Sequence, residues 1–163
     1  MRKYLLSMYT MMMVAMLSFN LSSCSKDDDG DGESSGLVGA WKRIEKIDTK
    51  YEKVNGNWEQ LGDPRVSNYS DRKSVSGYLF SEDHTAAFID INQDGSYEIE
   101  EKFQYKTEGN KLFMLEQDQA DTDDWEEVGS FNFDNGILVI TEIDEEENRK
   151  EVEVIRYSKV VLK

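Results

Sequence analysis

Five residues near position 95 have the types and spacing of a calcium-binding loop. Asp90, Asn92 and Asp94 stand at loop positions 1, 3 and 5, with Gly95 at position 6 and Glu101 at position 12. Oxygens at these positions can surround a hard cation, and glycine at position 6 permits the sharp turn. The flanking segments predict strands, however, and not the helices of an EF-hand. The sequence favours a hairpin turn rich in Asn, Asp and Gly. A weak calcium site at Asp90, Asn92 and Asp94 is the alternative.

The only cysteine is the second group with chemistry of its own. Two basic residues precede an uncharged apolar run over residues 4–21, and two serines stand directly before Cys24. A basic start, an apolar centre and small residues before a cleavage point are the parts of a secretory signal peptide. A lone cysteine cannot form an intramolecular disulfide, so Cys24 must have another use.

Leu21-Ser22-Ser23-Cys24 resembles the lipobox of bacterial lipoproteins. The resemblance implies cleavage before Cys24, a diacylglycerol on its thiol and an acyl chain on the new amino terminus, which a palmitate analogue would label. The expected organisation is a signal peptide over 1–23, an acidic flexible tether over 24–35 and a folded domain over 36–163. Two or more acyl chains hold a protein firmly, so a membrane is an expected partner. An uncleaved membrane helix with a free thiol is the alternative.

The tether begins with Ser25-Lys26-Asp27-Asp28-Asp29, and Asp31 follows. In Bacteroidetes, acidic residues after the acylated cysteine resemble the signal that sends a lipoprotein to the outer face of the outer membrane. The expected location is therefore the outer membrane, at the cell surface. A solvated linker has the same composition, because Asp, Gly and Ser bury too little apolar surface to fold. The two interpretations are compatible.

Charge and length limit the class of protein. The net charge of −15 becomes −17 when residues 1–23, which carry two basic and no acidic side chains, are removed. Such a surface excludes nucleic acid as a partner, since phosphates bind to Lys and Arg. The 140 residues that remain suit one domain. Acidic stretches over 118–124 and 144–147 predict solvated loops, with binding of cations or a basic partner as the alternative.

Catalytic groups do not converge anywhere in the sequence. His84 is the only histidine, a Gly-x-Ser-x-Gly turn is absent, and no spacing singles out a pair of carboxylates for acid–base work. We therefore expect neither an enzyme nor a cofactor, apart from the lipid on Cys24.

From residue 37 onward, short segments of alternating or apolar residues are separated by turn residues, which predicts strands. The segments expected as strands are 37–47, 51–54, 58–61, 78–80, 85–91, 96–105, 112–115, 125–133, 137–143 and 152–157. Asn55-Gly56 predicts a tight hairpin, and residues 62–76 predict a long polar loop with a helical turn. Tight turns predict antiparallel order, and closure into a barrel would remove exposed strand edges.

Within the segment 96–105, apolar side chains recur at every second position. Tyr97, Ile99, Phe103 and Tyr105 are expected to share one face of a strand, which Glu101 interrupts.

The segment Leu37-Val38-Gly39-Ala40-Trp41-Lys42 resembles the opening Gly-x-Trp strand of the lipocalin-like proteins of Bacteroidetes. Residues 78–83, 105–112 and 138–140 resemble later strands of that family, so the resemblance covers about residues 36–160. It implies an all-β fold, an antiparallel up-and-down lipocalin-like β-barrel of about eight to ten strands, with Gly39 and Trp41 at the closed end. A basic side chain near the carboxyl end covers the Trp in that family, which implies Arg156 here.

One turn departs from the family. Asp83-His84-Thr85 stands where the family more often has Asp-Gly-Thr.

The function that the resemblance implies is the non-catalytic binding of a small apolar or amphipathic ligand. The alternative is a structural or interaction protein, an accessory of an outer-membrane uptake complex that acts through its outer surface. A cavity open at one end would favour the first function, and a barrel packed solid would count against it.

Overall fold

The structure is a computed structural model and describes residues 34–117 and 124–163. The signal peptide, Cys24, most of the tether and the acidic stretch 118–123 lie outside the described residues. All strand pairings described below lie within one compact unit that begins at Asp31. In the described part of the chain, no helix has the length and apolar character needed to cross a membrane.

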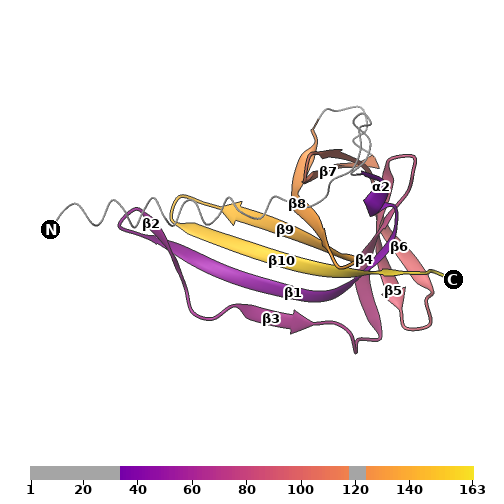
Figure 1. Ribbon diagram of the computed structural model, residues 1–163, viewed down its shortest axis with the longest axis horizontal. Coiled ribbons are helices and arrows are strands. Elements are labelled where there is room, and N and C mark those ends of the chain that lie inside the picture. Colours follow the sequence, from indigo (N-terminus) through magenta and orange to yellow (C-terminus); the bar gives the residue numbers. More distant parts are fainter. Residues whose placement is uncertain (1–33, 118–123) are drawn as a thin grey trace. The chain divides into compact units, whose positions relative to one another are not determined.

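One helical turn and ten strands make up the described fold (Figure 1). They are α2 (Ser34–Leu37), β1 (Gly39–Val54), β2 (Asn57–Gln60), β3 (Arg65–Asn68), β4 (Ser74–Phe80), β5 (Thr85–Asn92), β6 (Tyr97–Glu108), β7 (Lys111–Glu116), β8 (Glu126–Asp134), β9 (Ile137–Glu145) and β10 (Arg149–Val160).

Eight of these strands close into a barrel. The order is β1-β4-β5-β6-β7-β8-β9-β10, each pair is antiparallel, and β10 pairs back with β1. β2 and β3 are additional strands, and both pair with β1. The prediction of an all-β, antiparallel, up-and-down barrel is confirmed.

Three barrel strands continue past the barrel and form a sheet that we call the blade. β1 pairs with β4 only over Gly39–Lys42, then with β3 over Glu45–Asp48 and with β2 over Tyr51–Val54. On its other side β1 pairs with β10 as far as Glu52. Figure 1 shows β1, β10 and β9 side by side, running from the barrel toward β2. The blade comprises residues 45–68 and 142–154.

The expectation of a loop with a helical turn over 62–76 is wrong. This segment contains β3 and the first residues of β4. Val66 lies opposite Ile47 in the ladder with β1, so β3 satisfies backbone groups that β1 exposes after it leaves β4. A lone short strand of polar residues carries little periodic signal, and its partner fixes it as a strand. The hairpin at Asn55-Gly56 is confirmed, with positive φ angles of 51° and 83°.

The expectation that one face of β6 carries all four apolar side chains is also wrong. A bulge at Glu100 shifts the register between β5 and β6. One extra residue reverses the faces of a strand. Tyr97 and Ile99 are therefore 37% and 46% exposed, whereas Phe103 and Tyr105 pack in the barrel core.

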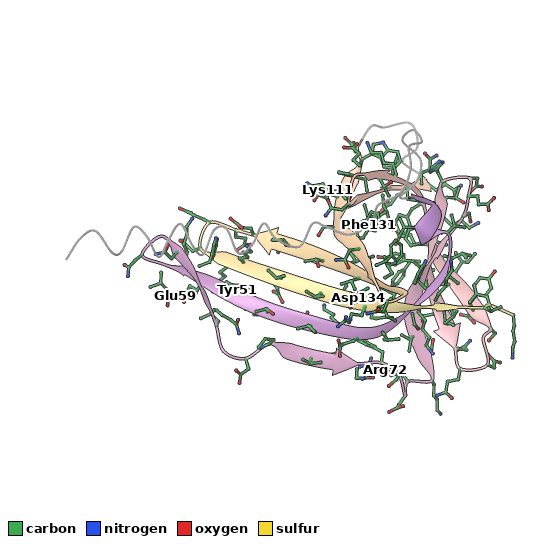
Figure 2. The ribbon with its side chains drawn as sticks, viewed as in Figure 1. Tyr51, Glu59, Arg72, Lys111, Phe131 and Asp134 are labelled. Carbon is green, nitrogen blue, oxygen red and sulfur yellow. The ribbon has the colours of Figure 1, made fainter. Side chains whose placement is uncertain are left out.

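The main core fills the barrel interior, mostly with large side chains. Buried there are Leu37, Trp41, Phe80, Ala86, Tyr105, Leu112, Met114, Phe131, Leu138, Ile140, Ile155 and Tyr157. Figure 2 shows Phe131 among them, on β8. A smaller cluster lies on the opposite face of the same wall, where the C-terminal residues Val160 and Leu162 pack against Ala87, Ile89 and Ile91 of β5.

Candidate functional site

The closed end of the barrel is built around Trp41. The indole is 2% exposed, and its Nε1–H donates a hydrogen bond to the carbonyl oxygen of Leu37 at 2.6 Å. The ring centroid lies 5.8 Å from that of Phe133. Because Leu37 ends α2 and is itself fully buried, the bond fixes the helical turn over this end of the barrel. Trp41 therefore packs between α2 and Phe133 and joins α2 to β1.

Lys159, and not Arg156, covers the Trp41 ring. The Lys159 Nζ lies 5.4 Å from the ring centroid, within the range of a cation–π contact. Gly39 has a φ of 126°, and a Cβ there would stand 2.7 Å from Lys159 Cε. Glycine at position 39 thus leaves room for the lysine stem.

Arg156 lies on the other face of β10, and the assignment from the resemblance is corrected. Its guanidinium lies 2.9 Å from Asp134 and 3.9 Å from Glu45. Successive side chains of a strand point to opposite faces. Tyr157 and Lys159 share the inward parity of β10, and Arg156 has the outward parity.

The calcium-like motif forms the β5–β6 hairpin turn. The Asp94 carboxylate accepts hydrogen bonds from Ser96 N at 3.0 Å and from Ser96 Oγ at 2.7 Å. Asn92 Nδ2 also donates to Ser96 Oγ, at 3.1 Å. Gly95 has a φ of 87°, and the bonds from Ser96 lower the pKa of Asp94. Asp90 lies on β5. The favoured hairpin turn is what the structure has. Calcium binding stays a prediction, which an unchanged melting temperature in millimolar calcium would contradict.

Three blade carboxylates approach one another, although no spacing in the sequence indicated that they would meet. Oxygens of Asp48, Glu151 and Glu153 lie within 4.8 Å of each other. The ammonium of Lys46 lies 2.6 Å from Glu153 and 3.0 Å from Asp48, and Lys50 lies 3.6 Å from Glu151. A lysine therefore already holds the position between two of these carboxylates. The arrangement is an ion-pair network across β1 and β10, which only the register of the two strands brings together.

The open end of the barrel contains a small pocket. It measures 190 Å³, and its apolar wall consists of Tyr78, Phe103, Met114 and Val128. Its rim consists of the acidic residues Glu116, Asp124, Glu126 and Glu127. Met114 is buried, and the other three wall residues pack partly buried against the core. The pocket thus has an apolar floor and an acidic entrance.

Gly129 opens this end of the barrel. β8 pairs with β9 only from Ser130 to Asp134, and a register shift separates β8 from β7 at the same level. Gly129 has a φ of 153°, and a Cβ there would stand 2.4 Å from the carbonyl oxygen of Thr141. Only glycine fits this close approach to β9, which lies next to Ser130, the first residue of β8 that pairs with β9.

Burial raises the pKa of both Tyr78 and Glu142. Burial, followed by the charge of Glu142, raises the pKa of Tyr78 to about 12. Burial, followed by the charge of Glu153, raises the pKa of Glu142 above its usual range.

Hollows on the blade are more polar than the pocket at the open end of the barrel. One of 350 Å³ is lined by Lys50, Tyr51, Glu52, Leu61, Asp144, Glu146, Arg149, Lys150 and Glu151.

His84 occupies a backbone conformation that suits glycine. It stands in the turn between β4 and β5 with a φ of 62°, and its ring lies 5.6 Å from that of Tyr105. Glycine adopts a positive φ at less cost than histidine does, so the backbone at position 84 would favour glycine.

Two of the expected sites cannot be placed on this geometry. Cys24 and the acidic residues 118–123 lie outside the described residues, and Asp124, which follows them, lies at the pocket rim.

Comparison of the chain with protein-family models, with curated proteins and with solved structures finds no match.

Proposed function

We propose that the protein is a surface-exposed outer-membrane lipoprotein whose barrel binds a small amphipathic ligand at its open end, without catalysis. The lipobox-like residues before Cys24 and the acidic tether support the location. The pocket formed by Tyr78, Phe103, Met114 and Val128 carries the proposal for binding, because it joins an apolar wall to a polar rim in one concave site.

The size of the pocket limits the ligand. Sites for drug-sized molecules measure about 300–1,000 Å³, and this pocket measures 190 Å³. Packed aromatic and aliphatic side chains fill the barrel beyond it. The ligand is therefore a short molecule held at the mouth, and a long acyl chain threaded into the barrel does not fit.

The rim favours a positive charge at the solvent end of the ligand. Glu127 is paired with Lys111 at 2.7 Å, whereas Asp124 and Glu126 are exposed carboxylates at the entrance. A cationic group there would gain from both, and the apolar part would lie against Phe103 and Met114.

Met114 allows a direct test. It is the only methionine after residue 16, so a ¹³C-methyl methionine label in the lipid-free chain from Ser25 reports on the pocket. Benzylamine, benzyl alcohol and benzoate are probes of similar size and different charge. We expect a saturable shift of the Met114 methyl resonance that is largest with benzylamine and absent with benzoate. Val128→Asp should abolish it, and Val66→Asp, on the exposed strand β3, should leave it unchanged. A methyl resonance that none of the probes moves at millimolar concentration would refute the binding function.

A second candidate function rests on one face of the blade. Val66 and Ile143 are 60% and 58% exposed, and they flank Ile47, Val152 and Val154 on the same face of neighbouring strands. Such a face suits a protein partner, which in an uptake complex would be an outer-membrane transporter. Co-purification with a transporter should be lost in Val66→Asp and Ile143→Asp and kept in Val161→Asp, which changes a 90% exposed valine elsewhere.

A further inference from the structure

Arg43 is a cation without an anionic partner in a strongly acidic chain. The sequence holds 34 acidic and 19 basic side chains, and in the described part of the chain Lys46, Lys50, Lys106, Lys111, Lys150 and Arg156 each form an ion pair with a carboxylate. Arg43 forms none with any described residue, although its Nε is buried. Arg43 is half-buried, and its buried Nε–H has no acceptor in the described part of the chain, so this position needs an explanation.

The Tyr157 hydroxyl beside Arg43 is also left without a partner. Tyr157 faces Arg43 across the β1–β10 ladder and is 0% exposed. Arg43 lies close enough to Tyr157 to oppose the rise that burial causes in the pKa of its hydroxyl, but neither the hydroxyl nor Arg43 Nε has a hydrogen-bond partner of suitable geometry. One oxygen acceptor placed between them would satisfy both groups.

Two further side chains complete the surroundings. Tyr69 follows β3 at the fork where β1 leaves β4, and its ring lies 5.5 Å from the guanidinium carbon of Arg43. Arg72 stacks on the same ring at 4.4 Å and likewise forms no ion pair among the described residues. Figure 2 shows Arg72 beyond the tip of β3. Two guanidinium groups are thus held on one aromatic ring, which fixes them without neutralising them.

Among the described residues, none of the nearby carboxylates forms an ion pair with Arg43. Asp48 and Glu153 are held by Lys46, the next inward residue of β1. Glu142 lies close enough to influence Tyr78 and Tyr157, and the charge of Arg43 opposes the rise in the pKa of Glu142. No ion pair joins Glu142 to Arg43, so the guanidinium keeps donors for a further oxygen ligand.

We propose that Arg43, Tyr157 and Arg72 form a binding site for an oxyanion, either a carboxylate or a phosphate, at the fork between β1 and β4. A planar guanidinium group binds carboxylates and phosphates through paired hydrogen bonds. The Tyr157 hydroxyl supplies a further donor inside the barrel wall. The site is independent of the ligand pocket at Met114, and either can fail alone.

Nuclear magnetic resonance of the arginine side chains tests the site. Acetate and inorganic phosphate are added to the ¹⁵N-labelled chain from Ser25, with sodium chloride at matched ionic strength as the reference. We expect a saturable shift of the Arg43 Nε–H resonance and a rise in melting temperature beyond that in chloride. A response to acetate assigns a carboxylate ligand, and a response to phosphate alone assigns a phosphate ligand.

Three variants separate binding from structure. Arg43→Gln should remove the rise in melting temperature, and Tyr157→Phe should weaken binding about tenfold by deleting one hydroxyl donor. Arg65→Gln makes the same change of charge on exposed β3 and should bind as the unchanged chain does. If neither anion moves the Arg43 resonance of the unchanged chain, Arg43 serves only the fold and the proposal is overturned. This outcome is measured on the unchanged chain, so it does not depend on whether a variant folds.

Discussion

Replacing Trp41 by phenylalanine isolates the hydrogen bond that closes the barrel. Phenylalanine keeps an aromatic ring against Phe133 and removes the Nε1 donor that binds the carbonyl of Leu37 at 2.6 Å. Leu37 is fully buried, so its carbonyl loses a partner at a dry position. An unsatisfied buried acceptor costs about 1–3 kcal/mol, and the smaller ring leaves a void that adds about 1 kcal/mol. The expected loss in the free energy of unfolding is about 2–4 kcal/mol.

Urea unfolding followed by circular dichroism measures this loss, and hydrogen exchange of the amides of residues 37–41 shows whether α2 is released. Both should change together, because the bond joins α2 to β1. A loss below about 0.5 kcal/mol with unchanged exchange would refute the view that this bond closes the barrel.

A double-mutant cycle then identifies the cation on the indole. Trp41→Leu combined with Lys159→Met should show a coupling energy of about 0.5–1 kcal/mol, the strength of a partly exposed cation–π contact. The matched pair, Trp41→Leu with Arg156→Met, should show none, since Arg156 binds Asp134 and Glu45. Coupling to Arg156 instead of Lys159 would contradict the geometry.

For three more substitutions, the structure predicts whether the free energy of unfolding rises or falls. Glu142→Gln should raise stability at neutral pH, because burial and Glu153 raise the pKa of Glu142 and disfavour its charged form. The gain should vanish in urea titrations as the pH falls through that pKa. Tyr78→Phe should reduce alkaline unfolding. The pKa of Tyr78 is raised from 10 to about 12, so its contribution is complete below pH 10 and is lost between pH 10 and about 12, by about 2–3 kcal/mol. Phenolate absorbance at 295 nm checks that titration. His84→Gly should stabilise by about 0.5–1 kcal/mol in thermal unfolding, since glycine adopts a positive φ without strain. A loss would mean that the contact with Tyr105 outweighs the backbone term.

The amino-acid sequence determined those features that depend on neighbouring residues. Alternation of apolar and polar side chains marked most strands, and Asn55-Gly56 marked the hairpin, because a positive φ at both positions is a local requirement. Tight turns implied antiparallel neighbours, and the removal of exposed strand edges favoured a closed barrel. Trp41 could be placed at the closed end through the Gly-x-Trp resemblance.

Tertiary structure decided which side chains meet across strands. One-residue register shifts after Arg43 and at Glu100 exchange the inward and outward faces of β1 and β6. In β10, Lys159 points to the same side as Trp41, whereas Arg156 points to the opposite side. The fork at Arg43 likewise joins residues from β1, β10 and the connection after β3. Periodicity within a strand carries no information on the register of its partner, and a shift of one residue exchanges the two faces of a sheet. For that reason the pocket and the surroundings of Arg43 can be seen only in the folded barrel.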